Sequence, residues 1–322
     1  MKKLSSLLIL CSLLIIFGFS SITKERNDTL NILKIKSPQK LKQFFSYSTD
    51  RIPFICAHRG GSRELFPENC IATFENTLSQ VHAMIETDPR YTKDSVIILM
   101  HDPTLDRTTN GTGRVIDHTW AELKKLRLKD PEGNITDYQI PTLDEALEWA
   151  KSRTILVLDR KDVPVGIRIK KIMEHKAGAN AIVIAYSFDE IKECYRLNPD
   201  IVMEVLLPDA EQVKKFEETG VPWKNVIGFV SHNLVENTEI FELIHSKGTM
   251  CIVGSSRNHD LSYKKGEIKT FQELSEKYLK MVNDGADIIE ADLAIEAGLS
   301  LKAGGSMNRS NSKKKFFSYK RI

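Results

Sequence analysis

The sequence is short of three features that would point to particular classes of protein: net charge, cysteine and glycine-rich loops. Its formal net charge is only +3, and the excess is explained by a basic cluster near the end of the sequence, Lys313, Lys314, Lys315, Lys320 and Arg321. A basic surface for nucleic acid is therefore not indicated, and we expect no nucleic-acid partner. No glycine-rich dinucleotide or P-loop motif follows any of the apolar runs, which disfavours a nucleotide-binding sheet.

Cysteine is scarce, with five residues in a chain of 322. Cys11 lies in an apolar stretch near the start, and the others are too widely spaced for a zinc site or a dense disulfide framework. We expect these four, Cys56, Cys70, Cys194 and Cys251, to be buried free thiols.

The first residues carry a targeting pattern. Lys2 and Lys3 precede an apolar run from Leu4 to Phe19, and small residues between Gly18 and Ser21 offer a cleavage site. We predict a secretory signal peptide over residues 1–20, and export to the periplasm or the extracellular space. The run falls short of the roughly 20 apolar residues of a comfortable span, so no stable membrane span is expected after cleavage. An uncleaved leader would instead act as a membrane anchor.

The rest of the chain divides into three predicted parts. Residues 21–51 are polar and lysine-rich, which is typical of a linker or a docking segment. Residues 52–303 have the length and the apolar content of one large domain. Residues 304–322 are basic and rich in Gly, Ser and Asn, and we predict a disordered tail.

Within residues 52–303, short apolar runs alternate with amphipathic, helix-like segments. This alternation predicts parallel strands with crossover helices. Nine runs are strand-like: Phe54 to Ala57, Ala83 to Ile85, Val96 to Met100, Thr154 to Leu158, Ala181 to Ala185, Ile201 to Leu207, Val226 to Val230, Met250 to Val253 and Ile288 to Ile289.

The predicted fold is a distorted α/β TIM (β/α)8 barrel, with a doubly wound open sheet as the alternative. Nine runs are one too many for eight strands, and Arg90 to Ser95 is too short for a crossover helix. We therefore expect the second and third runs to form a hairpin-like departure from the barrel. The segment from Pro103 to Ile140 has few strand signals, which predicts a small insertion or lid after the third strand.

Polar residues follow several of the apolar runs. They are His58, Glu86 with Asp88, His101, Asp159 with Lys161, and Glu290 with Asp292. The carboxyl ends of all strands of a parallel barrel meet on one face, so these groups would converge around one cavity. Carboxylates suit a hard divalent cation, and histidines suit proton transfer near neutral pH. A single strand-end acid is more often a solvated cap, so the interpretation depends on their joint placement.

The remaining histidines do not stand with other polar residues at predicted strand ends, and we expect them to be surface residues or hydrogen-bonded core residues. They are His82, His118, His175, His232, His245 and His259.

An ordered series of motifs resembles the glycerophosphodiester phosphodiesterase family. The motifs are His58-Arg59-Gly60, Pro67-Glu68-Asn69, Glu86-x-Asp88, Thr92-Lys93-Asp94 and the run from His101 to Gly111. Weaker similarity continues through Pro141-Thr142-Leu143, Asp159-x-Lys161, Ser187-Phe188 and Gly285-Ala286-Asp287, so that the resemblance covers roughly Phe54 to Ala297.

The resemblance implies a TIM-barrel hydrolase that uses a divalent metal to cleave glycerophosphodiesters to glycerol 3-phosphate and an alcohol. His58 and His101 would be the acid/base pair, and Arg59 and Lys161 would contact the phosphate of this small-molecule substrate. The metal would be held by three acids, Glu86, Asp88 and Asp159.

The chain departs from the family pattern at several positions. Asp159 stands where glutamate is usual, and its shorter side chain favours Ca²⁺ over Mg²⁺, because Ca²⁺ tolerates longer and more flexible coordination. Cys70 replaces a usual threonine, and Pro89 follows Asp88 where a small apolar residue is common. Glu290 stands where threonine is common, so it could repel a second negative charge or bind a cationic headgroup.

Two other functions are compatible with these residues. One is a related phosphodiesterase that acts on a lysophospholipid or a cyclic phosphodiester. The other is a catalytically weak barrel that binds glycerophosphodiesters as a recognition module, which the shortened acid at Asp159 would favour.

Overall fold

The computed structural model describes residues 29–305 and 312–321, and the predicted signal peptide lies outside them. Within the described residues, eight parallel strands close a barrel, with the last strand pairing with the first. In spatial order they are β2 (Phe54–Ala57), β3 (Ala83–Thr87), β6 (Leu156–Leu158), β7 (Ala181–Ala185), β8 (Met203–Leu206), β9 (Val226–Ser231), β10 (Cys251–Gly254) and β11 (Ile288–Ala291). The predicted TIM barrel is confirmed.

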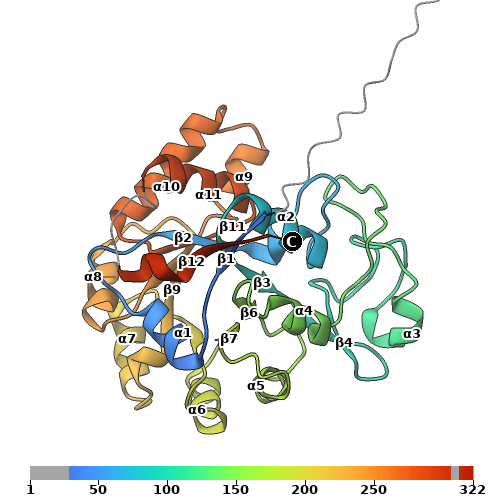
Figure 1. Cartoon of the computed structure of the whole chain (residues 1–322), viewed down its shortest axis with the longest axis horizontal. Coiled ribbons are helices and arrows are strands. Elements are labelled where there is room, and N and C mark those ends of the chain that lie inside the picture. The colour runs from blue at the N-terminus through green and yellow to red at the C-terminus, as the bar shows by residue number, and fades with distance from the viewer. Residues whose placement is uncertain (1–28, 306–311, 322) are drawn as a thin grey trace, which may run out of the picture.

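A helix follows each barrel strand and covers the outside of the barrel (Figure 1). These helices are α2 (Ile71–Gln80), α4 (Leu143–Ala150), α5 (Val165–Glu174), α6 (Phe188–Leu197), α7 (Ala210–Glu217), α8 (Glu239–Ser246), α10 (Phe271–Asp284) and α11 (Ala294–Ala303). Short polar side chains start several of them; Thr142, for example, forms a capping box with Glu145 at the start of α4. A further short helix, α9 (His259–Lys264), lies between β10 and α10.

The third strand-like run leaves the barrel, as the short connection before it predicted. After β3 the chain continues directly into β4 (Pro89–Tyr91), which pairs antiparallel with β5 (Ile97–Leu99). The hairpin removes one run from the nine and leaves eight for the barrel.

The segment after β5 forms the predicted insertion. It carries α3 (Trp120–Leu123) and a small core of its own, which includes Leu105, Val115 and Leu128. In Figure 1, α3 and β4 lie on the opposite side of the barrel from α7 and α8. Lys129 to Gly133 of this insertion reach the mouth of the barrel cavity.

Two segments outside the predicted domain are folded, so the described part of residues 21–51 is the docking segment rather than the linker of the two alternatives, and the described residues of the predicted disordered tail over 304–322 are ordered. Residues Thr29–Leu33 form β1, and Pro38–Phe45 form α1. Near the end of the sequence, Phe317–Arg321 form β12, which pairs antiparallel with β1 (Figure 1). The sequence prediction missed this packing because both segments are rich in lysine, and only a few of their side chains are apolar and dock on the barrel.

These two segments close the amino-terminal end of the barrel. Phe44 and Phe45 of α1 and Phe316 belong to the same apolar cluster as inward-facing strand residues such as Phe54 and Met84. The Phe44 ring packs edge-on against Phe316, with 5.5 Å between the ring centroids. The buried ammonium group of Lys313 donates to the carbonyl oxygens of Phe44 and Ser46 at the end of α1. Its charge is well placed there, because a helix carboxyl terminus attracts cations.

A buried carboxylate at Asp287 holds the connection to the first barrel strand. One of its oxygens accepts hydrogen bonds from His245 Nε2 at 2.8 Å and from the Cys251 amide at 2.7 Å. Its other oxygen forms an ion pair with Arg51, which directly precedes the barrel. His245, Cys251 and Asp287 could in principle hold a metal, but Arg51 already neutralises the carboxylate, and burial raises the pKa of Cys251 well above its ordinary value. We interpret this cluster as structural.

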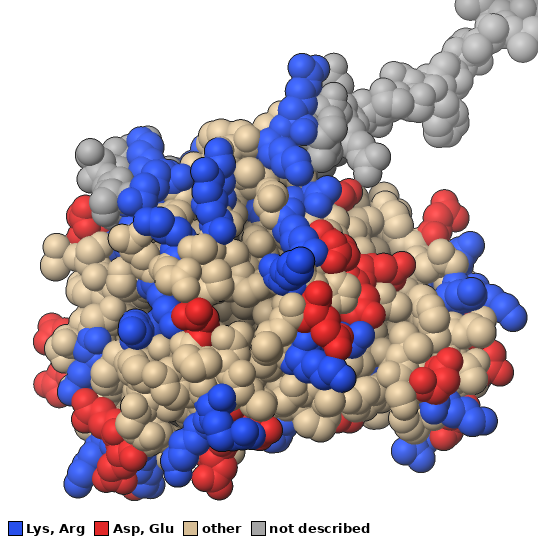
Figure 2. Space-filling view, turned by 60° about the horizontal axis from the view of Figure 1, so that its bottom comes forward, with Lys and Arg blue, Asp and Glu red and all other residues tan. Residues whose placement is uncertain are grey.

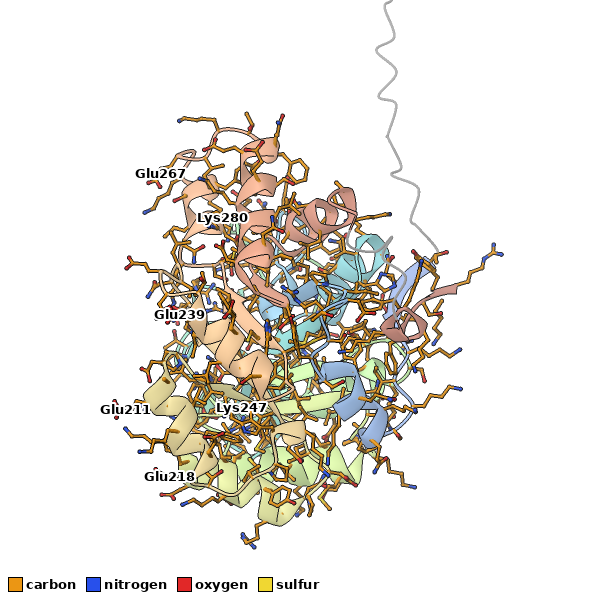
Figure 3. All side chains as sticks on the ribbon, turned by 90° about the vertical axis from the view of Figure 1, so that its left-hand side faces the viewer. Glu211, Glu218, Glu239, Lys247, Glu267 and Lys280 are labelled. Carbon is orange, nitrogen blue, oxygen red and sulfur yellow. The ribbon has the colours of Figure 1, made fainter. Side chains whose placement is uncertain are left out.

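The outer surface carries both positively and negatively charged side chains. Lys and Arg side chains are interspersed with Asp and Glu over the face drawn in Figure 2. Figure 3 shows labelled charged side chains projecting outward from the helical layer, among them Glu211 of α7 and Lys280 of α10.

Among the described residues, no helix combines the length and the apolar character that a membrane span needs. All four cysteines expected to be buried free thiols are buried and unpaired with one another.

Replacing Phe316 by alanine tests the docking of the second segment. Phe316 is only 4% exposed, and we expect Phe316→Ala to lower the free energy of unfolding by about 3 kcal/mol, the usual cost of truncating a buried phenylalanine. The matched control is Tyr319→Ala on β12, because Tyr319 is 65% exposed and its loss should cost less than about 1 kcal/mol. The measurement is equilibrium denaturation, and equal effects of the two substitutions would show that the segment does not pack in solution.

Candidate active site

One cavity of about 1240 Å³ opens at the carboxyl ends of the barrel strands. All of the predicted site residues except Asp88 line it: His58, Arg59, Glu86, His101, Asp159 and Lys161. Asp88 is buried beside them, with its carboxylate 3.0 Å from the ammonium group of Lys161. Convergence at one barrel end therefore places together residues that are up to about a hundred positions apart in sequence.

Three carboxylates form the centre of the site. Glu86, Asp88 and Asp159 are 3%, 1% and 8% exposed, and each offers an oxygen within 4.8 Å of the oxygens of the other two. Burial, together with the negative charges of Asp88, Asp159 and Glu290, raises the pKa of Glu86 well above its ordinary value. The pKa of Asp159 is lowered: burial opposes its ionisation, but Lys161 and a hydrogen bond from Tyr186 outweigh the burial.

Two sharply turning loops hold these carboxylates in place. The Arg59 amide donates to Glu86 at 2.8 Å, and the Asn69 side chain donates to Asp88 at 2.6 Å. Both residues have a positive φ, of 51° and 55°, so the loop backbone is bent to present these donors. Gly60 completes the first turn with a φ of +92°, and a side chain there would meet the Phe74 ring at 2.5 Å.

The three-carboxylate cluster fits a divalent cation. Its donors are all oxygens, as Ca²⁺ and Mg²⁺ require, and three carboxylates that share one buried site need a positive counter-charge. The ammonium group of Lys161 supplies part of that charge, at 3.0 Å from Asp88 and 2.5 Å from Asp159.

His58 is held by an aspartate on the last barrel strand's loop. Its Nδ1 lies 2.6 Å from Asp292 Oδ1, and Lys264 pairs with the other oxygen of Asp292 at 2.6 Å. Burial by itself would lower the pKa of His58, but the hydrogen bond to Asp292 and the charges of Glu290 and Asp292 raise it overall. Because Nδ1 is engaged, proton exchange with a substrate must take place at Nε2.

His101 is anchored in the same way by a longer chain of charges. Its Nδ1 lies 2.8 Å from Asp102, Asp102 accepts from Arg107 Nε at 2.7 Å, and Arg107 donates in turn to Glu68 at 2.8 Å. Burial lowers the pKa of His101, and the hydrogen bond to Asp102 only partly compensates. The two histidines are therefore held in the same way, but their pKa values are shifted in opposite directions.

Arg59 and Lys161, the phosphate contacts that the family resemblance implies, lie beside the carboxylates. The Arg59 guanidinium is 3.3 Å from Glu68 and 3.8 Å from Asp88. Lys161 has a strained positive φ of 33°, and it contacts two of the three proposed metal ligands. Both cations face the cavity, so a bound phosphate would meet them next to the three-carboxylate cluster.

Several site residues were not predicted. Asp102, Arg107 and Glu68 lie in the quoted motifs, but nothing in the sequence indicated that they form one chain of ion pairs. His232, expected to be a surface or hydrogen-bonded core residue, is an exposed residue that also lines the cavity, where partial burial lowers its pKa to about 4.

The sequence analysis also did not predict Glu204 as a site residue, because it lies inside a run that has the pattern of an apolar strand. The alternation of that run could have indicated it, since it separates the buried Met203 from Val205 and therefore points into the barrel.

Comparison with known proteins identifies the family. The model of the glycerophosphoryl diester phosphodiesterase family matches residues 58–205. A glycerophosphodiester phosphodiesterase of Bacillus subtilis is 31% identical over 194 residues, covering 54% of this chain and 65% of the relative. Human glycerophosphodiester phosphodiesterase 1 is 42% identical over 104 residues, which are 30% of each chain. The matched part thus spans no more than about two thirds of these curated relatives.

Solved structures give longer matches. A phosphodiesterase of Oleispira antarctica, solved in complex with sn-glycerol-3-phosphate, shares the fold, with a TM-score of 0.58 and 20% identity over 78% of this chain and 97% of that one. A glycerophosphoryl diester phosphodiesterase of Parabacteroides distasonis has a TM-score of 0.84 and 40% identity, covering 90% of this chain and 99% of that one. With that identity over a complete solved relative, the chain belongs to the glycerophosphoryl diester phosphodiesterase family.

Proposed function

We propose that this protein hydrolyses glycerophosphodiesters to glycerol 3-phosphate and an alcohol, with a divalent metal and two histidines. The observation that carries the proposal is the pair of histidines, each bonded through Nδ1 to an aspartate, on the same cavity as three buried carboxylates and two cations. The named activities of its relatives support the same reaction.

Each group has a role that its position explains. Glu86, Asp88 and Asp159 would hold the metal, which when bound supplies positive charge to the non-bridging oxygens of the phosphate. Arg59 and Lys161 would orient the phosphodiester and stabilise the charge that grows on it during attack. Asp292 and Asp102 fix the tautomers of the two histidines.

The reaction then needs two proton transfers. A glycerol hydroxyl of the substrate attacks phosphorus and gives its proton to one histidine, while the other histidine protonates the departing alcohol oxygen as its bond to phosphorus breaks. Water next opens the resulting cyclic phosphate with the histidines in reversed roles, and glycerol 3-phosphate leaves. Both histidines end in their starting states.

The pKa directions divide the roles between the histidines. The lowered pKa of His101 favours its neutral form, which suits the base of the first step. His58, whose pKa is raised, holds its proton more firmly and suits the acid. The hydrogen-bond partners support this division, because Asp292 stabilises a protonated His58, whereas Arg107 neutralises Asp102 beside His101.

Ca²⁺ is our proposal for the metal. Asp159 reaches less far than glutamate would, and its oxygens also accept hydrogen bonds from the Arg160 amide at 2.6 Å and from Tyr186. A larger ion with flexible coordination tolerates such a constrained ligand better than Mg²⁺ does. Export also remains our proposal, because it rests on the sequence of residues 1–20.

Replacing either histidine by alanine tests the catalytic pair. We expect His58→Ala and His101→Ala each to lower kcat by roughly 10²- to 10⁴-fold, the usual contribution of a positioned acid or base. The assay is release of glycerol 3-phosphate from glycerophosphodiesters with different alcohols. The matched control is His175→Ala, because His175 lies on the outside and bonds to Asp144 and Glu148. Activity within a few-fold of wild type in either variant would remove that histidine from the mechanism.

The pH dependence of kcat/KM tests the division of roles. The base must be unprotonated, so the acidic limb should lie below the ordinary histidine value of about 6.5, while the acid must be protonated, so the basic limb should lie above it. Asp292→Asn removes a group that raises the pKa of His58, so it should move the basic limb to lower pH. Asp102→Asn should move the acidic limb to lower pH for the same reason. Each variant serves as the other's control. If Asp292→Asn moved the acidic limb, or Asp102→Asn the basic limb, the roles of His58 and His101 as acid and base would be reversed.

Metal removal tests the three-carboxylate cluster. Chelation should abolish turnover, and added Ca²⁺ should restore it at lower concentration than Mg²⁺. Asp159→Asn should weaken Ca²⁺ binding measured by calorimetry at least about tenfold, because it removes a charged ligand. Asp162→Asn, which removes an acid that pairs with Arg90 outside the cluster, is the control. Wild-type Ca²⁺ binding in Asp159→Asn would show that Asp159 is not a ligand.

A further inference from the structure

The floor of the cavity carries two carboxylates to which the proposed reaction gives no part in metal binding, phosphate binding or proton transfer. Glu204 of β8 and Glu290 of β11 both line the cavity, yet their residues are only 2% and 4% exposed. They lie on strands from different parts of the barrel wall, separated by β9 and β10 on one side. A buried carboxylate is costly unless a partner compensates its charge.

The described residues provide little compensation for this pair. Glu204 Oε2 is buried and has no hydrogen-bond partner in the described part of the chain. Among the side-chain hydrogen bonds of the described residues, the only one to the Glu290 carboxylate is a weak bond from the Cys56 thiol, at 3.8 Å. Burial first, and then their mutual repulsion and that of Asp159, raises the pKa of Glu204 well above its ordinary value. An unpartnered acid pointing into a cavity suggests a ligand that brings positive charge.

The cavity wall beside Glu204 fits an organic cation. Phe229 and Tyr186 line the same cavity, together with the apolar side chains of Ile184 and Leu206. Ile184 and Glu204 are direct neighbours in the pairing of β7 with β8. Aromatic faces and carboxylates together bind ammonium groups, whereas a hydrated metal ion would not need the apolar wall.

The spacing along the strands places this floor within reach of the phosphate site. Glu290 precedes Asp292, the partner of His58, by two residues, so its side chain lies one inward-facing layer deeper. One such layer is roughly 7 Å, a distance that a short alcohol with an ammonium end can bridge from phosphorus. The cavity thus offers cations, Arg59 and Lys161, at the upper layer and anions at the lower layer.

We propose that Glu204 and Glu290 form a subsite for an ammonium group on the leaving alcohol, so that the enzyme prefers zwitterionic glycerophosphodiesters to neutral or acidic ones. The inference rests on the proposed hydrolysis. It assigns the choice of substrate to two acids that lie outside the three-carboxylate cluster and outside the histidine pair.

The test compares matched substrates on the wild-type protein and on Glu204→Gln and Glu290→Gln. The substrates are glycerophosphocholine and glycerophosphoethanolamine against glycerophosphoglycerol and glycerophosphoserine, at saturating Ca²⁺. In wild type the ratio of kcat/KM for choline to that for glycerol should exceed one. Glu204→Gln should lower that ratio about 10- to 100-fold, because the quaternary ammonium of choline donates no hydrogen bond and is held by its electrostatic attraction to the buried carboxylate. Glu218→Gln, an acid at the end of α7 far from the cavity, is the control.

Binding of choline chloride supplies a second readout that does not depend on turnover. Choline should bind the wild-type protein in calorimetry or inhibit it competitively, and Glu204→Gln should weaken both effects about tenfold or more. Thermal unfolding checks that each variant folds, and Glu290→Gln replaces Glu204→Gln if the latter does not.

The outcomes separate the two proposals. Hydrolysis of all substrates without preference, or an unchanged ratio in both variants, overturns the ammonium subsite and leaves the proposed function standing. A uniform loss on every substrate assigns the acids to the glycerol end or to structure, and also overturns the subsite. No hydrolysis of any glycerophosphodiester, with choline still bound through Glu204, overturns the proposed function but not the subsite.

Discussion

Repulsion between buried carboxylates is the constraint around which this barrel end is arranged. Glu86, Asp88 and Asp159 lie within 4.8 Å of one another in a poorly solvated cavity, where like charges are expensive. Most of the contacts around them reduce that cost: the backbone amide of Arg59, the side-chain amide of Asn69 and the ammonium group of Lys161. The positive φ values at these three residues are the backbone strain required to aim those groups inward.

The same constraint explains why the insertion after β5 belongs to the site. Arg107 of the insertion pairs with Asp102 and with Glu68, and Glu68 in turn pairs with Arg59 from the loop after β2. One row of alternating charges therefore links the insertion, both histidine-bearing loops and the cavity-lining Arg59. Asp130, also from the insertion, accepts the Leu65 amide at 2.9 Å and fastens the same two loops farther out. The insertion therefore holds the side chain of His101 in position through Asp102 and Arg107, in addition to lining the mouth of the cavity.

Sequence reasoning succeeded where one strong rule applied and failed where contacts had to be known. Parallel strands end on one face, so His58, Glu86, His101 and Asp159 could be placed together from their positions alone. The chain of ion pairs through Asp102 could not, because its geometry depends on how the insertion folds. The folded end segments were missed for a different reason. Their few apolar residues, such as Phe44 and Phe316, gain stability only from the barrel opening that they fill, which no local pattern reveals.

The pairing of β1 with β12 gives the order of synthesis a physical consequence. All eight barrel strands are translated before β12, yet the aromatic cluster at the barrel's amino-terminal end is incomplete until Phe316 joins Phe44. A nascent chain therefore exposes the apolar residues at the amino-terminal end of its barrel until Phe316 has been translated. During that interval the incomplete barrel presents exposed apolar surface, which is the condition under which partly folded chains aggregate.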